Sequence, residues 1–397
     1  MVLANSESGT GRGVKPAAVV GKLLRALVGL VLLLFGFAGF FTCAAAGVDY
    51  PVVPPQPGVE AWPRGAFHVH TLRSDGRGTV EQVAAAARAA GLQFVVLTDH
   101  NDFTPREPAF VQGVLMVPAV EISTASGHLV AFGMQMPLDG ARARQEGVSA
   151  VEAAGGVSVL AHPVQKKNPW KDPEGARRAQ GFELYSADTF FREAVRSPFS
   201  RLLPAVGASF SNIRHAIMLL VTPQPASTER LLELTRERPR LALCSHDAHG
   251  LPRYVDVFHA LALYLPPAAL PEPLSTDPRT AAAQVTRALS SGQAVCAFRT
   301  LGEPMGFLLE GPLTEQREAR VGDVLTVRLP PHPPGSVRVE VWGAGRLRPD
   351  GTSIELVEEG AVQIEAWVQA PGRLLGSEWR PWIVPSPVRV LPRGSGI

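Results

Sequence analysis

Two short motifs place ligand-type side chains two residues apart. They are His68-Val-His70 and Asp247-Ala-His249. Side chains at i and i+2 of a β-strand point to the same side, so both members of a pair can reach one ion. Imidazole nitrogens and carboxylate oxygens are ligands for zinc, manganese and iron. Each motif alone is a weak signal, because a single histidine after an apolar run is more often a core or loop residue.

Further ligand-type residues follow other short apolar runs. They are Asp75, His100, Glu121, His128 and His162, each near the end of a predicted strand or in the loop after it. Six of the ten histidines fall at such places within one part of the chain. Buried strands seldom end in polar groups by chance. The clustering therefore predicts a polynuclear metal site.

The elements that must position these residues are apolar strands alternating with helices. Strands are expected at 67–70, 94–97, 114–120, 157–161, 181–185, 241–244 and 294–298. Strands that are apolar throughout predict a parallel sheet buried on both faces. Seven such units are enough for a distorted (β/α)7 barrel of the α/β class, whose sites lie at the C-terminal ends of the strands. Residues 190–238 are expected to form a helical insertion over the barrel mouth.

The last hundred residues have a different pattern. Segments 324–329, 336–342, 361–367 and 387–390 alternate apolar and polar residues, which is the period of half-exposed antiparallel strands. They predict a small Ig-like β-sandwich with a structural role. The expected domains are an N-terminal segment (1–48), a Pro-rich linker (49–65), the barrel (66–300) and the sandwich (301–397).

The N-terminal segment is expected to meet a membrane. Arg12, Lys15, Lys22 and Arg25 precede an uncharged run at 26–48, which is long enough to span a bilayer with the N-terminus in the cytoplasm. The alternative is a cleaved signal peptide, because Ala44-Ala45-Ala46 resembles a cleavage site. Cys43 also suggests a lipid anchor, although Phe41-Thr42 before it is an unfavourable context. An uncleaved anchor is the favoured interpretation, and in each case the body leaves the cytoplasm.

The cysteines and charges add two further expectations. Cys244 and Cys296 lie in predicted buried strands, and three cysteines are too few for a disulfide framework, so free thiols are expected. The 38 Lys and Arg residues nearly balance the 36 Asp and Glu residues, so no nucleic-acid partner is expected.

Taken in order, the motifs resemble those of the PHP (polymerase and histidinol phosphatase) superfamily. The matching residues are His68-x-His70, Ser74-Asp75-Gly76, Thr98-Asp99-His100-Asn101, Glu121, His128, Ala161-His162-Pro163 and Asp247-Ala-His249. The resemblance covers residues 66 to 300 and implies a distorted seven-stranded barrel with two or three zinc, manganese or iron ions. The short distance from Glu121 to His128 departs from the family pattern and suggests a trimmed loop.

The resemblance also implies how the ligands are shared. One metal would be held by His68, His70, Glu121 and Asp247. A second would share Glu121 and add His128 and His162. A third would take Asp75, His100 and His249, which are also the predicted catalytic residues.

The leading hypothesis is an exported or membrane-tethered phosphoesterase that acts on a small-molecule phosphoester. Arg73, Lys166, Lys167 and Arg253 lie in loops beside the motifs and are candidates for binding phosphate oxygens. His246 and Glu183 are expected to line the site, and Asp99 is expected to support His100 or to cap a loop. Two alternatives stay open: a PHP-like hydrolase of carboxyl or carbamate esters, and a non-catalytic, metal-stabilised module that binds an envelope ligand.

Overall fold

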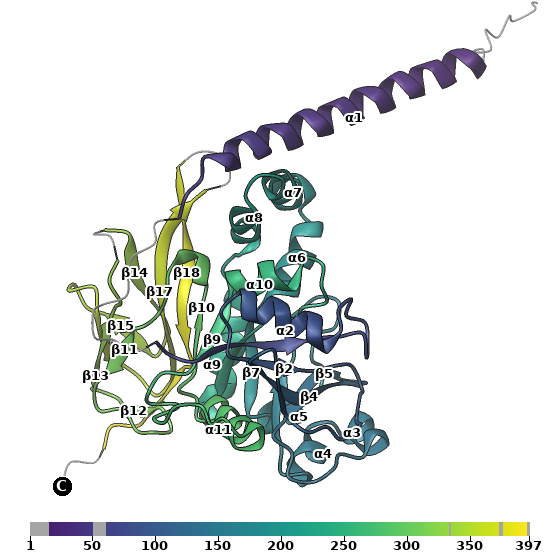
Figure 1. Ribbon diagram of the computed structural model, residues 1–397. Coiled ribbons are helices and arrows are strands. Elements are labelled where there is room, and N and C mark those ends of the chain that lie inside the picture. Colours follow the sequence, from purple (N-terminus) through teal and green to yellow (C-terminus); the bar gives the residue numbers. More distant parts are fainter. Residues whose placement is uncertain (1–15, 51–60, 333–334, 373–375, 395–397) are drawn as a thin grey trace, which may run out of the picture.

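The computed structural model describes residues 16–50, 61–332, 335–372 and 376–394. Arg12 and Lys15, and all of the predicted Pro-rich spacer after Tyr50 up to residue 58, lie outside these residues. Within them the fold is mixed α/β, with a long apolar helix at the N-terminal side (Figure 1).

The strands that carry the predicted ligands belong to one sheet. In spatial order they are β1 (Arg64–Val69), β2 (Phe94–Leu97), β4 (Val114–Thr124), β5 (Gly127–Phe132), β6 (Val157–Leu160), β7 (Gly181–Ser186) and β8 (Leu241–Ser245). Most neighbours are parallel, as expected for strands that are apolar along their whole length. The prediction of a purely parallel sheet is wrong at β5, which runs antiparallel to β4 and β6, and at the predicted strand 294–298, which runs antiparallel to both of its neighbours.

The sheet is not a closed ring, so the predicted closed barrel is not confirmed. Among the described residues, no continuous ladder of backbone hydrogen bonds joins β8 to β1. The segment that follows β8 makes this connection instead. The His246 amide donates to the Phe67 carbonyl (2.9 Å), and the Ala248 amide donates to the His68 carbonyl (3.2 Å). These bonds place residue 247 directly beside the paired histidines.

Helices cover this sheet and connect its strands. They are α2 (Val80–Ala89), α3 (Gly140–Glu146), α4 (Val148–Ala153), α5 (Pro173–Arg178), α9 (Pro225–Glu237), α10 (Tyr254–Ala260) and α11 (Pro278–Ser290). Their ends follow local sequence rules. Thr79 and Gln82 form a capping box at the start of α2, and the Asp277 side chain accepts a hydrogen bond from the Thr280 amide at the start of α11.

The predicted insertion is helical and comprises α6 (Ala187–Val195), a π-helical turn η1 (Pro198–Leu202), α7 (Leu203–Ser209) and α8 (Ile213–Leu220). Figure 1 shows α7 and α8 next to the C-terminal part of α1 (Pro16–Ala46), at one end of the body, and α7 packs against α1. The last predicted helix of the insertion, α9, instead packs against β7 and the C-terminal strands. The insertion is therefore shorter than predicted.

The C-terminal strands do not form a separate sandwich. Strands β9 (Ala262–Tyr264) and β10 (Val295–Ala297) extend the main sheet from β1, and it continues through β18 (Ser377–Pro385), β17 (Gly360–Pro371), β19 (Val388–Leu391) and β12 (Glu318–Arg320). Strand β14 (Val337–Gly343) pairs with β17, and β3 (Ala109–Val111) pairs with β4. A second sheet of β11 (Leu308–Glu310), β13 (Val324–Arg328), β16 (Ser353–Leu356) and β15 (Gly345–Leu347) contributes to the same apolar core. The prediction of an independent Ig-like domain is thus not confirmed.

Cys244 and Cys296 form a disulfide, so the prediction of free thiols is wrong. The bond joins β8 to β10. The Cα atoms of the two cysteines lie 5.8 Å apart, although their sequence separation is 52. That distance is within the range that a disulfide spans. Cys43 is the free cysteine among the described residues.

Candidate metal centre

Glu121 lies at the middle of the predicted ligands. Its Oε2 atom faces Nε2 of His68 (3.0 Å), Nε2 of His70 (3.2 Å) and Nδ1 of His100 (3.1 Å). Its Oε1 atom faces Nδ1 of His128 (2.8 Å) and Nε2 of His162 (3.3 Å). Each carboxylate oxygen therefore serves a different set of imidazoles, which is the arrangement of a bridging ligand.

His128 reaches Glu121 because β4 and β5 form a tight hairpin. Ser123 pairs with His128 across the two strands, and Gly127 adopts a φ of 135° at the turn. Glu121 and Ser123 point to the same side of β4, so the residue opposite Ser123 points there as well. The seven-residue interval is thus a hairpin rather than the trimmed loop that the sequence suggested.

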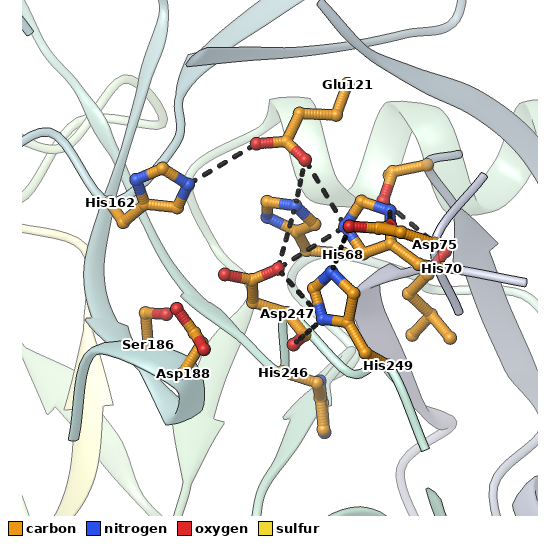
Figure 2. Close-up of polar contacts among 12 residues, drawn as sticks. His68, His70, Asp75, Glu121, His162, Ser186, Asp188, His246, Asp247 and His249 are labelled. Carbon is orange, nitrogen blue, oxygen red and sulfur yellow. Dashed lines mark hydrogen bonds and ion pairs between the residues drawn. The ribbon is translucent and has the colours of Figure 1, made fainter. Parts of the chain in front are cut away.

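Asp247 meets the paired histidines from the other side. Its Oδ1 atom lies 3.3 Å from Nε2 of His70 and 3.5 Å from Nε2 of His68. Both His68 (φ 66°) and Asp247 (φ 44°) adopt left-handed backbone conformations that residues with a Cβ seldom take. Such conformations cost energy and cluster at functional sites. Figure 2 shows His68, His70, Glu121 and Asp247 pointing toward one another.

A third group forms around Asp75 in the loop after β1. Asp75 Oδ2 lies 3.3 Å from Nε2 of His249 and 3.7 Å from Nε2 of His100. Asp99 fixes this loop by accepting hydrogen bonds from the Thr71 amide and hydroxyl (2.7 and 2.8 Å) and from the Ser74 hydroxyl (2.8 Å). Asp99 therefore positions the loop of Asp75, whereas the sequence suggested that it either supports His100 or caps the loop that follows Asp99.

Glu183, expected only to line the pocket, holds two of the predicted ligands in place. Its Oε1 atom accepts a hydrogen bond from Nδ1 of His68 (2.6 Å), and its Oε2 atom accepts one from the His162 amide (2.8 Å). A carboxylate on one ring nitrogen leaves the other nitrogen free to bind a cation and fixes the ring's orientation. Glu183 is thus a positioning residue for the centre.

The residues present fit divalent cations. Four buried ligand atoms make no hydrogen bond among the described residues, although the carboxylate oxygen lies 3.0 to 3.2 Å from the three nitrogens. They are Oε2 of Glu121, Nε2 of His68, Nε2 of His70 and Nδ1 of His100. Buried polar atoms without partners are rare and costly. Three ligand groups have atoms within 4.8 Å of one another: His70, Asp75, His100 and His249; His68, His70, Glu121 and Asp247; and His100, Glu121 and His128.

Charge pairing explains the acid–base behaviour of the centre. Burial lowers the pKa of His68, but the carboxylates of Glu183, Glu121 and Asp247 outweigh burial and raise this pKa well above its usual value. Burial opposes ionisation of Glu121 as well, yet His68 and the neighbouring imidazoles hold the pKa of Glu121 well below its usual value. Because imidazoles must be deprotonated to bind a cation, cation binding at these residues would release protons.

The predicted substrate-binding residues are placed unevenly. Lys166 lines a cavity beside His162 and Glu183, and Arg73 is exposed on the loop after β1. Arg253 is exposed, and its guanidinium pairs with both carboxylate oxygens of Asp256 (2.8 and 2.9 Å).

His246 was expected to line the site, but its buried ring serves the main chain instead. Its Nε2 atom donates to the Leu261 carbonyl (2.8 Å), and burial lowers its pKa to about 4. Figure 2 shows the His246 side chain directed away from the cluster.

A cavity of about 280 Å³ opens beside Asp247 and His249 and is lined in part by α6. Its wall includes Arg77, Arg192 and Asp188, which the sequence reasoning missed. Arg192 forms an ion pair with Asp188, one turn earlier on the same helix. The i, i+4 spacing of the two charges on a predicted helix was the available signal.

No protein-family model and no curated protein matches the chain. Solved structures do match. A two-domain protein from Bacteroides vulgatus containing a predicted PHP-like metal-dependent phosphoesterase is 13 % identical, with a TM-score of 0.37, over 84 % of this chain and 98 % of that chain. PsfC from Pseudomonas syringae is 14 % identical, with a TM-score of 0.35, over 57 % of this chain and 88 % of that chain. A protein from Bifidobacterium adolescentis assigned as a metal-dependent phosphoesterase is 16 % identical, with a TM-score of 0.31, over 48 % and 89 % of the two chains.

Proposed function

We propose that this chain is a PHP-type metal-dependent phosphoesterase, tethered to a membrane by α1 with its body outside the cytoplasm. One observation carries the enzymatic part. Glu121 and Asp247 bring their carboxylates against the paired imidazoles, and Nε2 of both histidines and Oε2 of Glu121 are buried without a hydrogen-bond partner among the described residues. A centre of this composition fits two or three zinc, manganese or iron ions.

Bound divalent cations supply a hydroxide nucleophile near neutral pH and neutralise phosphoryl oxygens. The protein's own residues prepare the site for this chemistry. Glu121, with one oxygen toward each set of imidazoles, sets the separation between ligand groups. Glu183 fixes the ring of His68, and Asp99 fixes the loop that carries Asp75.

Arginine at the cavity wall favours a phosphoester over a carboxyl ester. Arg77 and Arg192 border the cavity that contains Asp247 and His249. A guanidinium is a good donor to phosphate oxygens and binds a neutral carboxyl ester less well. We assign Arg77 to substrate orientation, together with the earlier candidates Lys166 and Arg73, whereas Arg192 is paired with Asp188.

The location of the body is supported by two independent features. Within α1, the segment Val19–Ala46 is long and apolar enough to cross a membrane, and very little of it is buried inside the protein. Lys22 and Arg25 lie on its N-terminal side, which favours a cytoplasmic N-terminus. The Cys244–Cys296 disulfide is typical of proteins that fold in an oxidising compartment.

The proposed function is tested with the purified full-length protein and three single variants. Asp247→Ala and His68→Ala remove ligands from the same group, whereas His332→Ala removes a histidine that lies outside the cluster. We expect the first two variants to lose bound metal and turnover of aryl phosphomonoesters or diesters, and His332→Ala to keep both. Metal content is measured by mass spectrometry, and rates are measured on a panel that includes aryl carboxyl esters.

The panel separates the hypotheses. Wild-type turnover of carboxyl esters alone would contradict the phosphoester assignment while leaving a metal-dependent hydrolase. Full metal content without turnover of any ester would favour the non-catalytic module. Unchanged rates in Asp247→Ala would refute the proposed centre itself.

A further inference from the structure

The helical insertion is fastened to the end of α1. The Thr42 hydroxyl donates to the Gly207 carbonyl (2.8 Å), and the Ser211 hydroxyl donates to the Thr42 carbonyl (2.7 Å). A Cβ at Gly207 would lie 2.7 Å from both the Ala38 carbonyl oxygen and the Phe41 Cβ. Small residues at such contacts let two helices approach closely, as they do between helices in membranes.

The position of this contact along α1 sets the depth of α7. The helix carries no charged residue from Ala26 to Ala46, a stretch of about 30 Å at the α-helical rise. That length equals the thickness of a bilayer's hydrocarbon core. Ala38 to Thr42 lie four to eight residues before Ala46, or about 6 to 12 Å inside its outer edge. An α7 helix held there would lie in the outer part of the acyl-chain region, just below the headgroups.

The insertion exposes apolar side chains that suit this depth. Phe199 and Phe210 are 67 % and 75 % exposed, and Phe191, Val195 and Val206 are also exposed. Phe191 and Val195 lie one turn apart on α6. Val206 on α7 and Phe210, the residue that caps the end of α7, have the same spacing, so each pair points to one side of its helix. We call these five residues the apolar face of the insertion.

The charges of the insertion match an anionic lipid surface. Residues 187–220 contain four arginines against two acidic residues, Asp188 and Glu193, although the charges of the whole chain nearly cancel. Among them, Arg196 and Arg214 are exposed. Arginines flanking apolar side chains are typical of helices that lie in the interface of membranes containing anionic lipids.

We propose that the apolar face of the insertion is immersed in the outer interface of the bilayer beside α1, as a second membrane contact. The inference rests on the proposed role of α1 as an uncleaved span. A lipid surface is favoured over a second copy of this chain because α7, which carries Val206 of the apolar face, packs directly on α1, whose own apolar side chains are exposed. Phe191 also lines the cavity at Asp247 and His249, so docking would place this cavity next to the headgroups.

The test uses the full-length protein in vesicles of phosphatidylcholine and phosphatidylglycerol. In a Cys43→Ser background, which keeps the Cys244–Cys296 disulfide, a nitroxide spin label is attached at Phe199→Cys or Phe210→Cys. Phe110→Cys is the matched control, because Phe110 is an exposed phenylalanine on β3. Collision rates with oxygen, which partitions into lipid, are compared with those of a water-soluble nickel complex. We expect the oxygen-to-nickel ratio at 199 and 210 to be several-fold higher than at 110.

A label at Leu33→Cys in α1 tests the membrane span separately from the docked apolar face. Ratios at 199 and 210 equal to that at 110, with a lipid-type ratio at 33, would refute the docked face and leave the span intact. A water-type ratio at 33 would refute the span and the docked face together. Strong dipolar broadening between labels at 210 would place a second copy on this face, and it would also overturn the inference.

Discussion

Replacing Glu183 by glutamine tests whether this carboxylate orients a metal ligand. The side chain is buried and accepts a 2.6 Å hydrogen bond from Nδ1 of His68. In Glu183→Gln, the amide oxygen can still accept from the His162 amide, but the amide nitrogen then faces Nδ1 of His68. Two donors cannot pair, so the ring is driven to the tautomer that carries its proton on Nε2. That nitrogen is the one that faces Glu121 and Asp247.

The size of the effect follows from what is lost. The bond joins an imidazole to a fully buried carboxylate, and loss of such a partner behind a metal ligand lowers metal affinity or activity by about 10- to 100-fold. This corresponds to roughly 1.4 to 2.7 kcal/mol of binding free energy. Solvent does not screen the interaction, because both side chains are 0 % exposed.

The assay is a competition titration of the metal-free protein with a fluorescent zinc chelator, alongside rates of aryl phosphate hydrolysis. Glu365→Gln is the matched control, since Glu365 is a second fully buried carboxyl group but lies on β17 and outside the three ligand groups. We expect the control to bind metal like wild type. Equal affinity and rate in Glu183→Gln and wild type would show that His68 needs no partner, and the account of Glu183 would be wrong.

Two further predictions concern stability. Burial raises the pKa of Glu365 to about 7, so the stability that this group contributes is complete below its usual pKa of 4.5 and is lost as the pH rises through 7. Glu365→Gln should therefore match wild type near pH 5 in urea unfolding and exceed it by up to roughly 3 kcal/mol at about pH 8; a constant difference across this range would contradict the assignment. Replacing both Cys244 and Cys296 by alanine should lower the free energy of unfolding by about 4 kcal/mol for a loop of this length. Urea midpoints that are equal with and without the disulfide would contradict that prediction.

The sequence was informative where chemistry and strand periodicity coincide. All nine predicted ligands converge, because each follows or lies on a strand whose apolar character fixes its place in the sheet. The short Glu121–His128 interval was misleading, since only the pairing of β4 with β5 shows it to be a hairpin. Arg253 was predicted on the same footing as the other basic candidates, although Asp256 three residues later offers it a local partner.

Other features depend on contacts between distant segments. The Cys244–Cys296 bond requires that β8 and β10 lie side by side, and no local pattern reports this. The alternating pattern of β17 predicted half-exposed polar residues, yet Gln363 and Glu365 are fully buried. The reason is that α9 packs against β17 and the hydroxyl of Tyr185 on β7 hydrogen bonds to Glu365. The sequence pattern of a single strand does not show that elements earlier and later in the chain will cover both of its faces.

The centre is assembled from segments as far apart as β1 and the turn after β8, so it does not exist until the chain has folded through residue 249. A polypeptide exported in an extended form would cross the membrane with no metal ion bound to its imidazoles and carboxylates. Under the proposed export, the identity of the bound ions would then be decided by which ions are abundant where folding finishes. Metallation in a cytoplasmic expression host would reflect that host's own ion supply instead.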